Sequence, residues 1–150
     1  MATGDSKRPS LAFSKTITSE SVMPFEILLD SNIIIYAAEP GYDALRRFIV
    51  KHDLAVVSVI SKVEVLGYHA LGLEDWNKFK AIFQALSVLP LSDEIFDQAI
   101  VLRQQKKMSL GDALIAATAL VRHIKLATAN VKDFKWIEEL ELVNPLIQFT

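Results

Sequence analysis

The chain has 150 residues, of which 51% are hydrophobic and 23% are charged, and its formal net charge is −2. This length fits one domain, and the hydrophobic content excludes disorder for most of the chain. The absence of cysteine excludes disulfides, cysteine-based zinc sites, iron–sulfur clusters and thiol catalysis. The slightly acidic balance argues against a protein that coats nucleic acid, because such proteins are usually basic.

The N-terminal segment and the longest apolar runs bear on location. Residues 1–22 are rich in Ser and Thr, and their apolar run Leu11–Phe13 is too short for a secretory signal. We expect a flexible N-terminal tail at 1–22 and a folded domain at 23–150. Apolar runs such as Ile33–Ala38 fall far below the ~18 residues that span a bilayer, so we expect no membrane segment and a cytoplasmic protein.

The pattern of apolar residues predicts strands that alternate with helices. In chain order we expect a strand at 26–30, helices at 33–38 and 42–52, a strand at 54–57, helices at 59–71 and 73–86, a strand at 87–91, helices at 92–107 and 112–123, a strand at 125–128 and a weaker strand at 140–143. The strands lack polar alternation, which is typical of a parallel sheet buried on both faces. The predicted fold is therefore α/β, with three α/β/α layers and a mainly parallel sheet of about five strands.

Acidic residues follow the predicted strands or begin the predicted helices. Asp30 ends the first strand, Glu64 lies early in the helix after the second, Asp112 begins a helix that is apolar almost all round, and Asp133 follows the fourth strand. In a parallel sheet the carboxyl ends of the strands meet at one edge, where ligands bind. Carboxylates gathered there would repel one another, which raises their pKa values or requires a cation. Oxygen ligands alone favour Mg²⁺ or Mn²⁺.

Each acid also has a structural interpretation. Ser61-x-x-Glu64 and Ser109-x-x-Asp112 both match a capping box, so either acid could serve only to begin a helix. Asp133 could be an ordinary turn residue. Asp30 favours a site more strongly, because a carboxylate that follows three apolar residues is costly to bury without a partner. The histidines are scattered without the spacing of metal ligands, so we expect them on the surface or in packing roles.

Four segments together resemble the acidic motifs of PIN-domain ribonucleases, and most closely those of VapC-type toxins of toxin–antitoxin pairs. They are LLDSNIIIY (28–36), SKVEVLGY (61–68), SLGDALIAATAL (109–120) and ATANVKDF (127–134). The resemblance begins near residue 25 and runs to the C-terminus. The tail departs from it, because such toxins usually begin a residue or two before the first strand.

The resemblance implies roles for these residues. Asp30, Glu64 and Asp112 would be metal ligands, and Asp133 would be the fourth acid of the catalytic and metal-binding set, often acting through water. Ser31 would stand beside the first acid, where the family has Thr or Ser, and Asn130 would orient the cluster. The implied activity is Mg²⁺-dependent (or Mn²⁺-dependent) endonucleolytic cleavage of RNA, by a homodimer that a cognate antitoxin inhibits.

Two other functions stay open for such a chain. One is a housekeeping PIN nuclease that processes RNA without an antitoxin, and the other is a catalytically silent PIN fold that binds protein or RNA. Basic residues could contact the RNA backbone, although we expect most of them to be solvated helix faces; they are Arg46, Arg47, Lys51, Lys62, Arg103, Lys106, Lys107, Lys132 and Lys135. Without the four site acids, basic residues outnumber acidic ones, so the net charge is compatible with RNA binding at a metal site.

Overall fold

The computed structural model describes residues 26–51 and 53–149, and the predicted tail at 1–22 lies outside the described residues. Within that part of the chain a parallel five-stranded sheet has the order β3-β2-β1-β4-β5. Its strands are β1 (Ile27–Leu29), β2 (Ala55–Ser58), β3 (Ser87–Leu89), β4 (Lys125–Ala127) and β5 (Leu142–Val143). The predicted α/β class and the five strands are confirmed.

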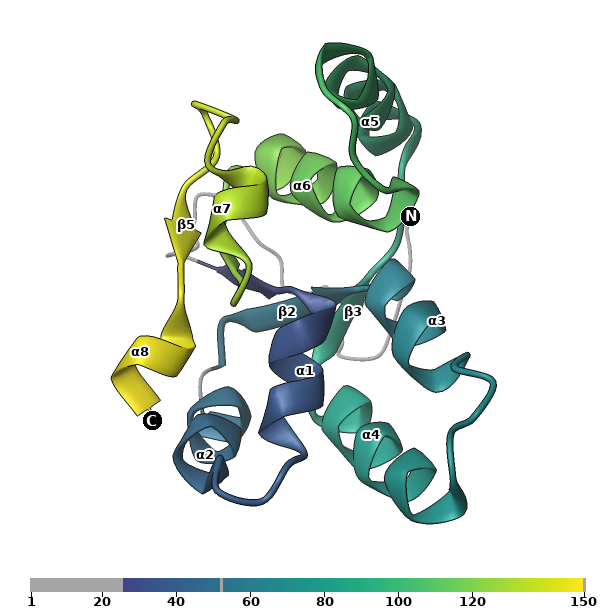
Figure 1. Cartoon of the computed structure of the whole chain (residues 1–150), viewed down its shortest axis with the longest axis vertical. Helices are drawn as coiled ribbons and strands as arrows, with labels where there is room; N and C mark the ends of the chain where they lie inside the picture. The colour runs from purple at the N-terminus through teal and green to yellow at the C-terminus, as the bar shows by residue number, and fades with distance from the viewer. Residues whose placement is uncertain (1–25, 52, 150) are drawn as a thin grey trace.

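Helices cover both faces of this sheet (Figure 1). They are α1 (Ser31–Ala37), α2 (Asp43–Lys51), α3 (Val59–Leu66), α4 (Leu73–Ala85), α5 (Asp93–Gln105), α6 (Leu110–Arg122), α7 (Val131–Phe134) and α8 (Pro145–Phe149). In Figure 1, α5, α6 and α7 lie on one side of the sheet, and α1, α2, α4 and α8 lie on the other. The three predicted layers are therefore present. No helix in the described segments is long and apolar enough to cross a membrane.

A separate hydrophobic core fills each side of the sheet. Because side chains alternate along a strand, Leu28 packs into the core beneath α5 and α6, whereas Leu29 packs into the core beneath α1, α2 and α4. Residues 113–119 of α6 are all buried, which confirms that this nearly all-apolar helix lies in the interior. On α4, Phe79, Ile82 and Phe83 are buried in the core, whereas Trp76 is exposed.

The structure corrects several predicted boundaries. The helix expected at 59–71 ends at Leu66, and Gly67 follows as its C-terminal cap. The helix expected from residue 112 begins at Leu110, because the Ser109 side chain accepts a hydrogen bond from the Asp112 N–H as its N-cap. Helices α7 and α8 were not predicted, because four or five residues are too few to show a helical period.

Candidate functional site

Asp30 lies at the carboxyl end of the central strand β1 and is 4% exposed. Its backbone N–H continues the ladder to β4 by donating to the Ala127 carbonyl at 2.9 Å. Its carboxylate then receives two hydrogen bonds, one from the Ser31 N–H to Oδ1 at 2.8 Å and one from Thr128 Oγ1 to Oδ2 at 2.7 Å. Asp30 thus serves as the N-cap of α1, and its carboxylate is oriented by the first residue of α1 and by Thr128, which follows β4.

Glu64 is connected to the same strand end through two serine hydroxyls. Ser31 Oγ donates to Glu64 Oε1 at 2.6 Å and lies 2.8 Å from Ser61 Oγ. An ionised carboxylate only accepts, so the single proton of Ser31 goes to Glu64 and Ser61 donates to Ser31. Ser61 is fully buried, one turn before Glu64 on α3. This chain of hydroxyls turns the exposed Glu64 towards Asp30.

The structure decides between the two capping interpretations. The N-cap of α3 is Ser58, whose side chain accepts from the Ile60 N–H, so Ser61 lies inside the helix and the proposed Ser61–Glu64 capping box is wrong. The Ser109 cap of α6 is confirmed, and the Ser109 side chain also interacts with the half-buried Asp112 carboxylate.

Glu64 also lies against the first turn of α6. A β-carbon built on Gly111 would lie 2.2 Å from Glu64 Oε2, so Glu64 occupies the space that a side chain at position 111 would need. Gly111 precedes Asp112, and this brings the carboxylates of α3 and α6 to the same place. A larger residue at position 111 would therefore displace the Glu64 carboxylate, whereas the backbone there is not strained.

Asp133 lies in the short helix α7, directly after β4, and is exposed. Its charge acts on Asp112, which links the fourth acid to the other three. Asn130 is the exposed residue before α7, and its backbone N–H donates to Thr128 Oγ1 at 3.0 Å. Asn130 thereby supports the threonine that orients Asp30, while the role expected for its side chain stays a prediction.

Burial and repulsion raise the pKa values of two of the acids. Burial raises the pKa of Asp30 to about 6; the hydrogen bonds from Thr128 and Ser31 oppose this rise, and the charges of Asp112 and Glu64 add to it. Burial also raises the pKa of Asp112. The hydrogen bond with Ser109 opposes this rise, and the charges of Asp133 and Glu64 add to it. The charges of Asp112 and Glu64 therefore disfavour the ionised form of Asp30, and those of Asp133 and Glu64 disfavour the ionised form of Asp112.

A divalent cation would relieve this repulsion. The donor set consists of carboxylate oxygens, which suit a hard ion such as Mg²⁺ or Mn²⁺. Across residues 26–51 and 53–149, however, no three His, Asp or Glu side chains are already arranged as metal ligands. Both oxygens of Asp30 and one of Glu64 receive hydrogen bonds from hydroxyl or amide donors. The residues fit the cation in charge and chemistry.

Sequence reasoning missed three residues that shape this site, which are Ser61, Gly111 and Thr128. Thr128 carried a usable signal, because it is a polar residue directly after a buried strand, as Asp30 is. Leu29 and Ala127 are partners in the parallel register, so the residues that follow them are neighbours. Ser61 and Gly111 offered no comparable signal, since their importance depends on how α3 packs against α1 and α6.

Comparison with known proteins identifies the fold family. A family model described as the PIN domain matches residues 27–140. The chain belongs to the PIN-domain family. This PIN-domain protein is 32% identical over 123 residues to Ribonuclease VapC10 of Mycobacterium tuberculosis, a match that covers 77% of this chain and 90% of the relative. It is 29% identical over 132 residues to Ribonuclease VapC1 of Rickettsia felis, covering 78% of this chain and 94% of the relative.

Solved structures share the fold. A toxin–antitoxin complex from Klebsiella pneumoniae contains a chain that matches with a TM-score of 0.67 and 28% identity, over 80% of this chain and 98% of that one. VapBC2 from Rickettsia felis, bound to a DNA fragment from its promoter, matches with a TM-score of 0.70 and 23% identity over the same shares. At 23% identity, the similarity to VapBC2 shows the fold alone.

Proposed function

We propose that this PIN-domain protein is an endoribonuclease that uses Mg²⁺ or Mn²⁺ to hydrolyse phosphodiester bonds in RNA, and that it is the toxin of a toxin–antitoxin pair. One observation carries the proposal: Asp30, Glu64, Asp112 and Asp133 come from four separate segments, and the charges of the other acids add to the rise that burial causes in the pKa values of Asp30 and Asp112. The ribonuclease names of its relatives support the reaction class, and the toxin–antitoxin complex among its structural neighbours supports the biological role.

Each acid has a proposed part in the reaction. Asp30 and Asp112 would hold the principal ion, Glu64 would share that ion or help to deprotonate the attacking water, and Asp133 would complete or position a second ion. A bound divalent ion supplies a more acidic water and stabilises the charge on the leaving oxygen. Thr128 and the Ser31 N–H orient Asp30, and the Ser31 hydroxyl holds Glu64. Because water would be the attacking group, no side-chain nucleophile is needed.

The proposed partners follow from the same comparisons. The substrate would be RNA, and the inhibitor would be an antitoxin protein. We also propose a homodimer that acts in the cytoplasm. The two alternatives, a housekeeping nuclease and a silent binding module, have no structural observation in their favour, and the clustering of four acids counts against a module that only binds.

The decisive experiment measures RNA cleavage by the purified chain with Mg²⁺ or Mn²⁺, beside the variants Asp30→Asn and Asp112→Asn. We expect both variants to fold and to lose about 100-fold or more in rate, as is usual when a charged group at the reaction centre is removed. Calorimetric titration with Mn²⁺ gives a second readout. Equal cleavage by all three proteins would overturn the site, and no cleavage by the wild type would overturn the enzyme.

A cell-based experiment then separates the toxin from a housekeeping nuclease. Overexpression of the wild-type chain should arrest growth, overexpression of Asp112→Asn should not, and co-expression of the product of an adjacent small gene should relieve the arrest. Harmless overexpression of a chain that cleaves RNA in vitro would instead assign it to RNA processing.

A further inference from the structure

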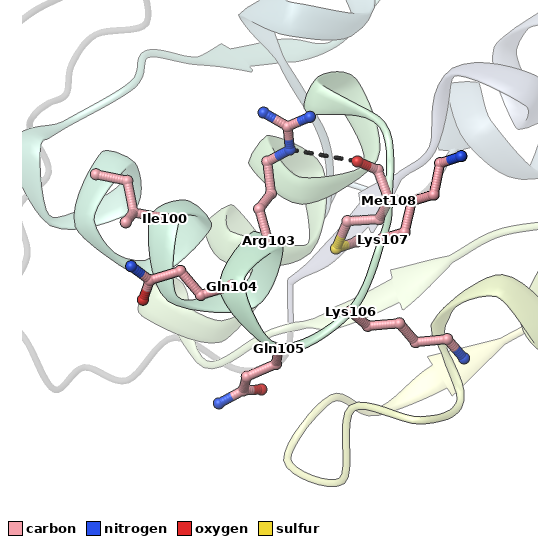
Figure 2. Close-up of a pocket in the computed structure, with 7 residues that line it drawn as sticks. All are labelled: Ile100, Arg103, Gln104, Gln105, Lys106, Lys107 and Met108. Atoms are coloured by element: carbon pink, nitrogen blue, oxygen red, sulfur yellow. Dashed lines mark hydrogen bonds between the residues drawn. The ribbon is translucent and has the colours of Figure 1, made fainter.

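A second charged feature lies at the C-terminal end of α5 (Figure 2). An open hollow of about 720 Å³ is lined by the end of α5 and by the connection to α6, through residues Ile100, Arg103, Gln104, Gln105, Lys106, Lys107 and Met108. Three of these residues are cations and none is an acid. We call Arg103, Lys106 and Lys107 the basic cluster. Five of the seven lining residues have polar or charged side chains, and Ile100 and Met108 are apolar.

The charges of the basic cluster are available to a partner. None of its three side chains forms an ion pair within the described segments of the chain, where Arg46 and Arg122 do so. Arg103 Nε donates to the Met108 carbonyl at 3.3 Å, which fixes the connection, and Lys106 Nζ lies 5.7 Å from the centre of the Trp136 ring. Figure 2 shows Lys106 and Lys107 extending from the connection, on the side away from Ile100.

The connection leads directly to the acidic site. Lys107 precedes the N-cap Ser109 by two residues, and Asp112 lies in the first turn of α6. Two extended residues span at most about 7 Å, and three helical residues rise about 5 Å, so the Cα atoms of Lys107 and Asp112 lie within about 12 Å of each other. A polymer that reaches Asp112 can therefore contact Lys107 at the same time.

We propose that the basic cluster binds the phosphate backbone of the RNA strand next to the bond that is cleaved. This inference rests on the proposed nuclease function and adds to it a second contact surface on the substrate. Arg103 at the end of α5 and Lys106 and Lys107 on the connection place three cations in succession. Such a series suits a row of phosphates better than a single anion. Contacts of this kind position a strand without reading its sequence, so the cluster contributes affinity and register but no base specificity.

The test uses the two lysines, because Arg103 also shapes the connection through its bond to Met108. The double variant Lys106→Gln/Lys107→Gln removes two charges while keeping side-chain length. Its matched control is Lys78→Gln/Lys80→Gln on α4, where Lys80 Nζ lies over the Trp76 ring at the same 5.7 Å. Both variants lose two exposed charges and one lysine–tryptophan contact, but only the first changes the surface beside Asp112.

Binding is measured by fluorescence anisotropy with a labelled single-stranded RNA of mixed sequence, without divalent ions and with EDTA, so that the RNA stays intact. For single strands log K falls with log salt by about 0.7 per phosphate contact. We therefore expect the Lys106/Lys107 variant to bind about tenfold more weakly at low salt and to lose about 1.4 from the salt slope. The control variant should match the wild type in both.

Each result is distinct from a failure of the nuclease proposal. Unchanged affinity and salt slope in the Lys106/Lys107 variant would overturn the basic cluster, whether or not the wild type cleaves RNA. Weakened binding in a protein that cleaves no RNA would retain the RNA contact and overturn the nuclease. Polyglutamate serves as a probe for an acidic protein segment: if the variant loses binding to polyglutamate while its RNA binding is unchanged, the cluster belongs to a protein partner and our assignment is wrong.

Discussion

Thr128 Oγ1 donates a hydrogen bond of 2.7 Å to Oδ2 of Asp30, a residue 98 positions earlier in the chain. Both side chains are buried, and each directly follows one of two paired strands, β1 and β4. This bond favours the ionised form of a carboxylate whose pKa burial raises. It therefore connects the register of the sheet to the charge state of the central acid.

Replacing Thr128 tests how much this hydrogen bond contributes to stability. We expect Thr128→Val to lower the free energy of unfolding by about 1.5–3 kcal/mol near pH 8, the usual contribution of a hydrogen bond to a charged group, and by about 0.5–1.5 kcal/mol more at any pH because Thr128 Oγ1 also accepts from the Asn130 N–H. The cost should shrink below about pH 4, where Asp30 is protonated in both the native and the unfolded chain. Urea unfolding at the two pH values measures both effects.

The matched control is Thr118→Val, because Thr118 is equally buried and donates at the same 2.7 Å, but to the neutral Leu114 carbonyl. Its cost should be about 0.5–1.5 kcal/mol and independent of pH. If the two variants depended on pH in the same way, Thr128 would not be acting on the charge of Asp30.

Asp30 itself should destabilise the metal-free protein at neutral pH. Its pKa is 3.8 in the unfolded chain and about 6 in the native state, so the native state binds the proton more tightly. Its contribution to stability is therefore fully present below about pH 4 and is lost as the pH rises through about 6. Asp30→Asn should raise the free energy of unfolding near pH 8 by up to about 3 kcal/mol, and should change it little near pH 4.

This prediction is checked by urea unfolding in EDTA, with the exposed Asp97→Asn on α5 as the control. A variant Asp30→Asn that was less stable than the wild type near pH 8 would contradict the raised pKa. The expected gain also matters for the cleavage experiment, because a more stable variant that has lost activity cannot have lost it by unfolding.

Metal ions should offset the destabilisation that the ionised Asp30 carboxylate causes at neutral pH. An ion that binds the native state alone stabilises it by mass action, by about 2.7 kcal/mol at a concentration of 100 times Kd. Adding Mn²⁺ or Mg²⁺ should therefore raise the Tm of the wild type, and EDTA should return it to the starting value. The Tm of Asp112→Asn and that of Asp30→Asn should respond much less, as differential scanning calorimetry would show. An equal rise in all three proteins would place the ion elsewhere.

Gly111 allows stability and activity to be separated. Ala is favoured over Gly in a helix by about 0.5–1 kcal/mol, but its β-carbon here would lie 2.2 Å from Glu64 Oε2. The flexible end of Glu64 can move away, so we expect Gly111→Ala to fold with nearly wild-type stability. Its RNA cleavage should fall about tenfold, because a small displacement of a group at the reaction centre is costly.

Gly72→Ala is the control, since a β-carbon there meets nothing within 4 Å. Its cleavage rate should equal that of the wild type. Should Gly111→Ala cleave RNA at the wild-type rate too, the position of Glu64 over α6 would be irrelevant to the reaction.

The apolar pattern predicted the parallel sheet because buried strands and amphipathic helices leave clear periods in the sequence. The short helices α7 and α8 left no period, and the Ser61-x-x-Glu64 pattern suggested a helix start where Ser58 had already taken the N-cap position. A capping pattern is local, and it cannot reveal that a cap three residues earlier is better placed.

Asp30 could be found because a carboxylate directly after a buried strand is conspicuous, and the roles of the other three candidate acids were assigned through the resemblance to the PIN-domain motifs. What the sequence could not provide is the register between strands and the packing between helices. The bond between Thr128 and Asp30 requires the register, and the contact of Glu64 with Gly111 requires α3 to lie against α6. Ser61, Gly111 and Thr128 were therefore missed, although Ser31, Asn130 and the four candidate acids were named.

The strand order has a consequence for the synthesis of the chain. The central strand β1 is the first to be made, yet one of its two neighbours, β4, is nearly the last. Because domains are built from the N-terminus during translation and distant pairings form slowly, Asp30 must wait for residues 125–128 before its surroundings are complete. A nascent chain that already carries Asp30, Glu64 and Asp112 still lacks the strand that orients the first of them, so an unfinished polypeptide on the ribosome has no assembled site.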